Sequence, residues 1–278
     1  MQLRAIPNTL SPDTVAEIDA LLDRVEREHS VAIPLAIESG SRAWGFPSPD
    51  SDYDCRFIYV RSIEHYLSPW QARDVIETPI ERELDVNGWD LGKALKLMLK
   101  GNAVIIEWLR SPIVYRGLTR FRDDFLALAH RHTKRAHIAQ HYLHLGERQR
   151  RTYFADEKAV QLKKLFYALR PAATLRWLRL HPVEAIAPMH FPTLMAECDP
   201  PAVLDRLIAE LLARKAETRE LGAAPLPQPI SAFMAAEFDL ARATYNPVPI
   251  RISDIARAEA ATFFRETVRH LSRPEHSP

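Results

Sequence analysis

The chain has 278 residues, of which 47% are apolar and 26% charged, and its formal net charge is +1. This composition is typical of a soluble globular protein, and the length allows one large domain or two modest ones. No apolar run approaches the roughly 18 residues that span a bilayer, and the first residues lack the features of a signal peptide. Cys55 and Cys198 show no metal-ligand spacing. We therefore expect a cytoplasmic protein with reduced thiols and no membrane association.

The first third of the chain mixes helical and strand patterns. Apolar residues recur with a helical period over residues 12–29, and Ser11 before Pro12 has the character of an N-cap with proline in the first turn. Three later segments are typical of strands because they are short and rich in β-branched and aromatic residues. They are residues 31–40, broken at Gly40-Ser41; residues 55–62; and residues 74–88, as one or two strands ending near Val86.

The rest of the chain has a helical period. We expect helices at 91–101, 103–110, 119–131, 134–150, 156–180, 201–221, 231–243 and 252–272, punctuated by prolines. The predicted fold class is α+β. A small unit with a mixed sheet, residues 1–117, would be followed by an all-helical unit, residues 118–278.

Residues 40–54 resemble two familiar motifs that they do not complete. Gly40 and Gly45 have the glycine spacing of a phosphate-binding loop, but Phe-Pro follows where that motif needs Lys and Ser or Thr. A calcium loop beginning at Asp50 would need glycine at its sixth position and glutamate at its twelfth. Those positions are Cys55 and Arg61. Both motifs are excluded.

A third interpretation is a metal site for phosphoryl chemistry. Residues i and i+2 of a strand point to the same side, so Asp52 and Asp54 can face one cation. Two metal ions held by carboxylates commonly neutralise the charge that such reactions develop. The turn at Gly40-Ser41, with a short helix beginning there, would offer N–H groups and a hydroxyl to phosphates. The alternative is an aspartate-rich turn that only shapes the entrance of a strand.

The stretch GSRAWGFPSPDSDYD resembles the G-S and D-x-D signature of the DNA polymerase β-like nucleotidyltransferase superfamily. That superfamily usually places a third carboxylate on a later strand between apolar residues, which fits Asp85; Glu83 and Asp90 are its competitors. The stretches DVNGWDLGKALKLMLKGN, EWLRSPIVY and LKKLFYALRP resemble the RNA-ligase-associated branch of predicted nucleotidyltransferases. The resemblance extends over roughly residues 30–180.

The resemblance implies a polymerase-β-like palm that transfers a nucleoside monophosphate from an NTP to a hydroxyl and releases pyrophosphate. Asp52, Asp54 and Asp85 would hold Mg²⁺ or Mn²⁺, and Gly40 and Ser41 would hold the terminal phosphates. RNA as the acceptor follows from the family association alone. The alternatives are a non-catalytic or antitoxin-like nucleotide-binding protein of this fold and a transferase that nucleotidylates a protein. The sequence leaves the NTP base and the oligomeric state open.

The helical half is strongly basic in one segment. Residues 134–179 contain eleven Lys or Arg against three acids. On a helical wheel, Lys163, Tyr167 and Arg170 gather at the edge of an apolar face, where they would suit a triphosphate. A solvated basic face is the alternative. A second basic patch consists of Arg148, Arg150 and Arg151. It would either contact RNA phosphates or form a solvated helix end.

Overall fold

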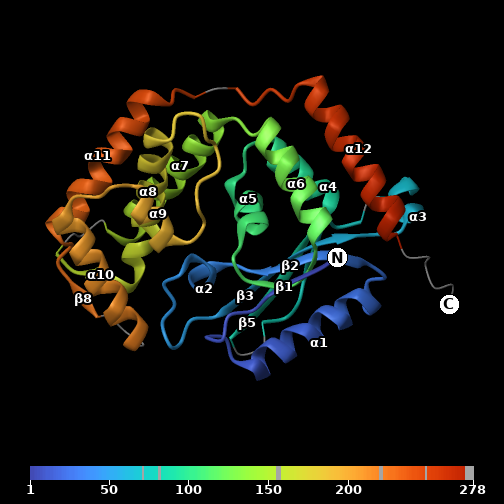
Figure 1. The fold of residues 1–278 in the computed structure, drawn as a ribbon, viewed down its shortest axis with the longest axis horizontal. Helices are drawn as coiled ribbons and strands as arrows, with labels where there is room; N and C mark the ends of the chain where they lie inside the picture. The colour runs from blue at the N-terminus through green and yellow to red at the C-terminus, as the bar shows by residue number, and fades with distance from the viewer. Residues whose placement is uncertain (71, 81–82, 155–157, 219–221, 248, 273–278) are drawn as a thin grey trace.

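The computed structural model describes residues 1–70, 72–80, 83–154, 158–218, 222–247 and 249–272. They form an α+β fold in which a mixed sheet is followed by a helical part, as predicted from the sequence. Figure 1 shows the sheet with α1 on one face and α4, α5 and α6 on the other, while α7 to α11 form a bundle beyond one end of the sheet. Among the described residues, the helices are too short or too polar to cross a bilayer.

The main sheet has the strand order β1-β6-β2-β3-β5-β4. Its strands are β1 (Gln2–Ala5), β2 (Ala32–Glu38), β3 (Tyr53–Val60), β4 (Val75–Glu77), β5 (Leu84–Asp90) and β6 (Val114–Leu118). The central pair β3 and β5 is parallel, and the other neighbouring strands are antiparallel. Segment 74–88 therefore contains two strands, and β5 continues to Asp90.

Alternation along β3 separates two cores. The core under α1 (Pro12–Glu28) contains the odd-numbered residues Tyr53, Cys55, Phe57 and Tyr59. The core under α4 contains the even-numbered Ile58 and Val60. Helix α1 begins where it was expected, because the Ser11 side chain accepts a hydrogen bond from the backbone N–H of Thr14. The even-numbered positions of β3 thus face α4, and they include both charged side chains of the strand.

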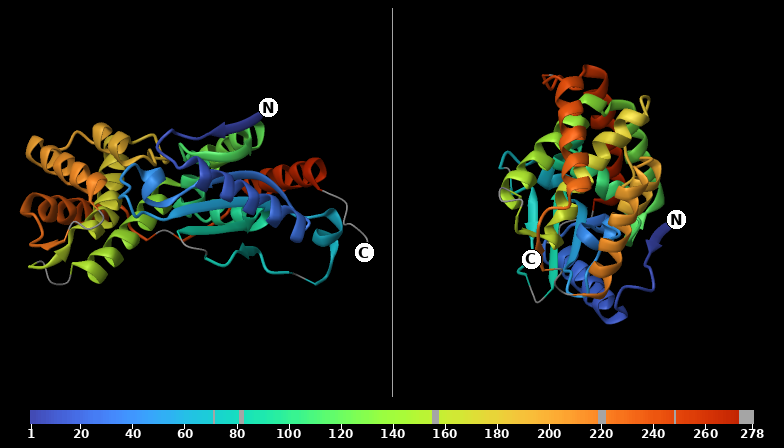
Figure 2. Two further views of the ribbon diagram at one scale, coloured as in Figure 1. Left: turned by 90° about the horizontal axis from the view of Figure 1, so that it is seen from below. Right: turned by 90° about the vertical axis from the view of Figure 1, so that its left-hand side faces the viewer.

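Most helices follow the predicted periodicity, but the short helices α3 and α9 were not predicted. The helices are α2 (Gly40–Trp44), α3 (Ile63–Leu67), α4 (Leu91–Leu99), α5 (Ala103–Arg110), α6 (Thr119–His132), α7 (Arg135–Tyr153), α8 (Leu162–Leu180), α9 (Phe191–Glu197), α10 (Ala202–Glu217), α11 (Gln228–Thr244) and α12 (Asp254–Leu271). After α11 the chain crosses the whole molecule, and α12 packs against α4 and α6 (Figures 1 and 2).

Several elements differ from the sequence prediction. Strands β1 and β6 were not expected, because both are short and lack the alternation that marks a half-buried strand. Helix α8 begins at Leu162, after strand β7 (Val160–Gln161), which pairs with β8 (Ala223–Ala224). The predicted segments 156–180 and 201–221 each include positions outside the described residues, at 155–157 and 219–221.

The division into two units at residue 117 stays a prediction. That boundary falls within the last residues of β6, immediately before α6. One hydrophobic core runs from Ile58 under α4 to Phe166 on α8 and Phe238 on α11. The helical bundle and the sheet therefore share an interior.

Candidate functional site

Two of the predicted carboxylates lie side by side in the centre of the sheet. Asp54 on β3 and Asp85 on β5 are register partners of the parallel pair. The guanidinium of Arg56, two residues after Asp54 on the same face, donates to Asp54 Oδ1 at 3.0 Å and to Asp85 Oδ2 at 2.7 Å. Burial raises the pKa of Asp54, and the Arg56 charge opposes that rise. An arginine thus offsets the repulsion within this carboxylate pair.

Asp52 lies on the loop just before β3 and is exposed. Its charge also raises the pKa of Asp54, so the two carboxylates are close enough to repel each other. Arg42 holds this loop, because it donates to the carbonyl oxygens of Ser51 and Asp52 and lies 3.9 Å from the centre of the Tyr53 ring. Across the described ranges, no three His, Cys, Asp or Glu side chains converge as a ready-made metal site.

Helix α2 touches the carboxylates through its first residue. Gly40 has φ +61°, and a Cβ at this position would lie 1.9 Å from Asp54 Oδ2. Only glycine allows both this backbone conformation and this close approach. The buried Ser41 donates its hydroxyl to Ser51 Oγ at 2.9 Å, which ties α2 to the loop before Asp52. The predicted Gly-Ser turn and the predicted carboxylates are therefore in direct contact.

A buried glutamate supports Asp54 from behind. Glu38, at the end of β2, is fully buried and accepts hydrogen bonds from the backbone N–H of Asp54 at 2.9 Å and from the Tyr115 hydroxyl at 2.5 Å. Burial raises the pKa of Glu38 to about 7, although both hydrogen bonds act in the opposite direction. Sequence reasoning missed this residue, because a glutamate at a strand end is usually exposed.

The titration of Glu38 predicts a measurable pH dependence of folding. Its pKa is about 7 in the folded state and about 4.5 when unfolded, so the folded protein binds more protons between these values. Stability from this group is therefore lost as the pH rises from about 4.5 to about 7, by about 3 kcal/mol. Glu38→Gln, which stays neutral, should remove that part of the pH dependence.

Urea unfolding of the wild type, Glu38→Gln and the exposed control Glu28→Gln over this pH range measures the effect. The free-energy difference between wild type and Glu38→Gln should change across the range, and by more than the difference for the exposed Glu28→Gln variant. A constant difference for Glu38→Gln would contradict the assignment.

Helix α8 brings two residues of the basic segment to the same site. Lys163 Nζ donates to Asp50 Oδ2 at 2.9 Å, and that contact lowers the pKa of Asp50. The Tyr167 ring lies edge-on to Trp44 of α2, with centroids 5.9 Å apart. Burial raises the pKa of Tyr167, and the charges of Asp54 and Asp52 contribute to the rise. Tyr167 therefore lies close to the carboxylates and keeps its phenolic proton.

Arg170 does not fit the role of a phosphate ligand. Its side chain is buried and forms an ion pair with Glu107 Oε1 at 2.9 Å. Its guanidinium lies 4.7 Å from the centre of the Trp44 ring, and Tyr142 also donates to Glu107. Pro171 lies inside α8, which continues to Leu180. Arg170 therefore serves the packing behind Trp44.

Other cations of the basic segment are also internal. Arg176 and Arg179 both pair with the buried Glu237 of α11, at 3.0 and 2.8 Å. Arg135 donates to the carbonyl oxygens of Leu178 and His181. Much of the segment's excess charge thus links the helices of the bundle, which a count of charges along the sequence cannot distinguish from a binding surface.

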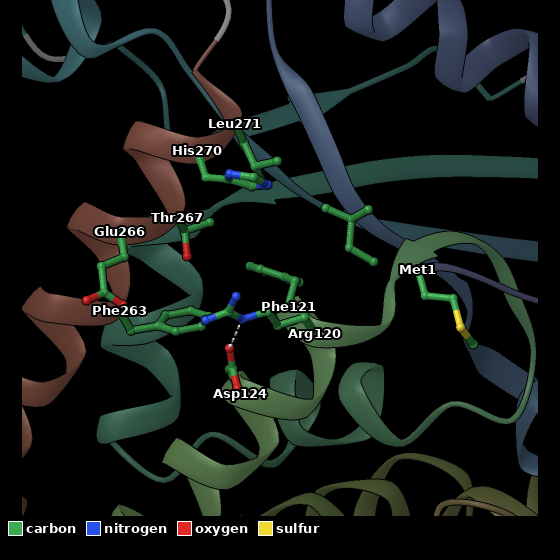
Figure 3. Close-up of a pocket in the computed structure, with 10 residues that line it drawn as sticks. Met1, Arg120, Phe121, Asp124, Phe263, Glu266, Thr267, His270 and Leu271 are labelled. Atoms are coloured by element: carbon green, nitrogen blue, oxygen red, sulfur yellow. Dashed lines mark hydrogen bonds and ion pairs between the residues drawn. The ribbon is translucent and has the colours of Figure 1, made fainter.

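The competitors of Asp85 occupy other positions. Asp90, at the far end of β5, caps α4 by accepting from Gly92 N at 2.7 Å, and it also accepts from the Tyr66 hydroxyl. Glu83 is exposed before β5 begins. A pocket of about 450 Å³ between α6 and α12, drawn in Figure 3, contains none of the predicted site residues.

Comparison with known proteins supplies the family. The profile of RlaP, described as the RNA repair pathway DNA polymerase beta family, matches residues 15–266. The chain is also 42% identical over 200 residues to the uncharacterized protein YcgL of Bacillus subtilis (strain 168), which covers 72% of this chain and 76% of that relative. The family match spans strands β2 to β6, the α2 turn and the helical bundle. The resemblance to the polymerase β-like superfamily is thereby confirmed, and the chain belongs to the RNA repair pathway DNA polymerase beta family.

Proposed function

We propose that this protein is a metal-dependent nucleotidyltransferase that moves a nucleoside monophosphate from an NTP to a hydroxyl of RNA and releases pyrophosphate. One observation carries the proposal: Asp54 and Asp85 are register partners on parallel strands, and Gly40 of α2 lies against Asp54. A transferase needs carboxylates and phosphate-binding groups within reach of the same phosphorus, and this arrangement supplies both.

The donor set fits a divalent magnesium or manganese ion. Asp52, Asp54 and Asp85 offer only oxygen, which Mg²⁺ prefers, and Asp54 Oδ2 is the oxygen that faces Gly40 rather than Arg56. Bound ions would neutralise the triphosphate and lower the pKa of the attacking hydroxyl. Phosphate oxygens of the substrate would complete the ligand set, because the described side chains alone do not form it.

The triphosphate would lie between α2 and the N-terminal end of α8. The first N–H groups of a helix have no partners within it, so Gly40 and Ser41 can donate to phosphate oxygens. Phosphate binding by the Ser41 hydroxyl would replace its bond to Ser51. Lys163 would exchange Asp50 for a phosphate, and Tyr167 would donate its hydroxyl. Arg170 has no place in this set.

The test is incubation with each NTP, labelled in turn on the α- and the γ-phosphate, with Mg²⁺ or Mn²⁺ and total RNA. We expect the α-label alone to enter RNA, with pyrophosphate released and with chelation abolishing transfer. RNA oxidised with periodate, which lacks terminal hydroxyls, is the matched control for addition at the end of the chain. Label that enters protein instead would replace the RNA acceptor with a protein. Absence of transfer with every NTP would contradict the proposal.

A further inference from the structure

A basic groove lies at the opposite end of β3 from the carboxylates. It has a volume of about 960 Å³, and its walls come from α3, the segment before β4, α4 and α12. Seven lysines and arginines line it, against two aspartates. Such an excess of one charge in a concave surface attracts anions of matching shape.

The two long walls of the groove carry their cations in helical register. Lys93 and Lys96 of α4 and its C-cap residue Lys100 are spaced i, i+3 and i+7, so they share one face of the helix. Arg257 and Arg265 of α12 are spaced by eight residues and face the same groove. Two helices that are far apart in the sequence thus present parallel rows of positive charge.

Several of these charges have no ion pair with a described residue. Lys93 pairs with Asp74 at 2.9 Å, and Asp90 is occupied by the α4 cap. Lys96, Lys100 and Arg257 are exposed, and no ion pair of theirs falls within the part of the chain that the structure describes. Like charges held close together repel, so this cluster is most stable with an external polyanion.

The floor of the groove is apolar. Leu95 and Leu99 of α4 lie opposite Ala260 and Phe264 of α12, and the Phe264 ring contacts that of Tyr66 with centroids 4.9 Å apart. Cationic walls above an apolar floor match a strand that alternates phosphates with flat bases. An inorganic anion would use the walls alone.

We propose that this groove binds the phosphate backbone of an RNA strand whose end reaches the carboxylates. This inference rests on the RNA acceptor of the proposed function. Asp54, near the start of β3, and Arg61, just after its end, are seven residues apart, which corresponds to about 23 Å of extended chain. The even-numbered side chains of β3 face α4, so the groove and Asp54 lie on the same side of the sheet. The RNA strand would extend over this distance, from the groove to the carboxylates.

The experiment compares two double charge reversals by fluorescence anisotropy with a labelled single-stranded RNA, in the absence of NTP and over a series of salt concentrations. Lys96→Glu with Lys100→Glu alters the groove. Arg24→Glu with Arg27→Glu is the matched control, because both arginines are exposed on α1, which covers the other face of the sheet. Both variants change the net charge equally.

We expect the groove variant to bind RNA at least about tenfold more weakly, with the slope of log K against log salt reduced by about 1.4 for two lost contacts to a single strand. The control should bind RNA like the wild type, and both variants should bind NTP normally by calorimetry. Equal RNA affinity of the two variants would overturn the proposal that the groove binds RNA. An acidic peptide that competes for the protein as well as unlabelled RNA does would also overturn it.

The outcomes also separate the groove from the proposed reaction. RNA binding that depends on the groove, in a protein that transfers no nucleotide, would sustain the groove and overturn the reaction. Nucleotide transfer to RNA by a groove variant that still binds RNA normally would sustain the reaction and overturn the groove.

Discussion

Asp54→Asn is expected to slow nucleotide transfer by at least about 10²–10³-fold, the cost of removing a group that stabilises charge in a transition state. The variant should melt at the same temperature as the wild type or slightly higher, because burial and the charges of Asp85 and Asp52 disfavour the ionised Asp54. An asparagine keeps an oxygen that can accept from Arg56. Activity and stability should therefore move independently.

Transfer rate and thermal midpoint, measured side by side, test this expectation. Asp124→Asn is the matched control, since Asp124 is exposed and pairs with Arg120 one turn away on α6. An Asp54→Asn protein that transfers at the wild-type rate would remove Asp54 from the catalytic set. A variant that is inactive because it unfolds would make Asp54 a residue of the strand entrance alone.

Arg170→Met is expected to destabilise the fold by about 3–5 kcal/mol, the cost of removing one partner of a buried ion pair. The change leaves the Glu107 carboxylate buried beside Trp44 without its cation. Adding Glu107→Gln removes that charge and keeps an oxygen to accept from Tyr142, so the double variant should recover most of the loss. Urea unfolding of the single and double variants measures both effects.

Lys163→Met separates a structural role from a ligand role on the same helix. Lys163 is partly exposed and pairs with Asp50 at the surface, so its replacement should change stability by less than about 1 kcal/mol. The prediction for Arg170 fails if Arg170→Met is as stable as the wild type but loses NTP affinity. Arg170 would then be the phosphate ligand that its place on the helical wheel first indicated.

The sequence was sufficient to predict which carboxylates lie together; their role as a metal site stays a prediction. Gly40 and Asp54 were placed together from a local signature, and the structure brings them into contact. Asp85 was chosen over Glu83 by its apolar neighbours, and the register of β3 with β5 puts it opposite Asp54. The proximity of these residues could be inferred because it depends on the two-residue period of a strand and on short spacings.

The electrostatic partners of the site were not predicted. Arg56 stands two residues after Asp54, so the same period could have placed it on the carboxylate face. Glu38 gave no such signal, because its burial depends on Tyr115 of β6, a strand that the sequence did not predict. The burial of Arg170, which speaks against its assignment to the triphosphate, was not predicted for a similar reason. Its partner Glu107 lies on another helix, and helical spacing says nothing about contacts between helices.

The position of β6 has a consequence for the order in which the chain can fold. Strand β1 pairs with β6 alone among the described strands, and β6 also covers the open edge of β2. Strand β1 therefore has no partner until more than a hundred further residues have been made. Contacts over such long stretches of chain form slowly, and an unpaired strand edge exposes the nascent protein to aggregation. The sheet that carries the carboxylates is completed only when β6, the segment after α5, pairs with β1 on one side and β2 on the other.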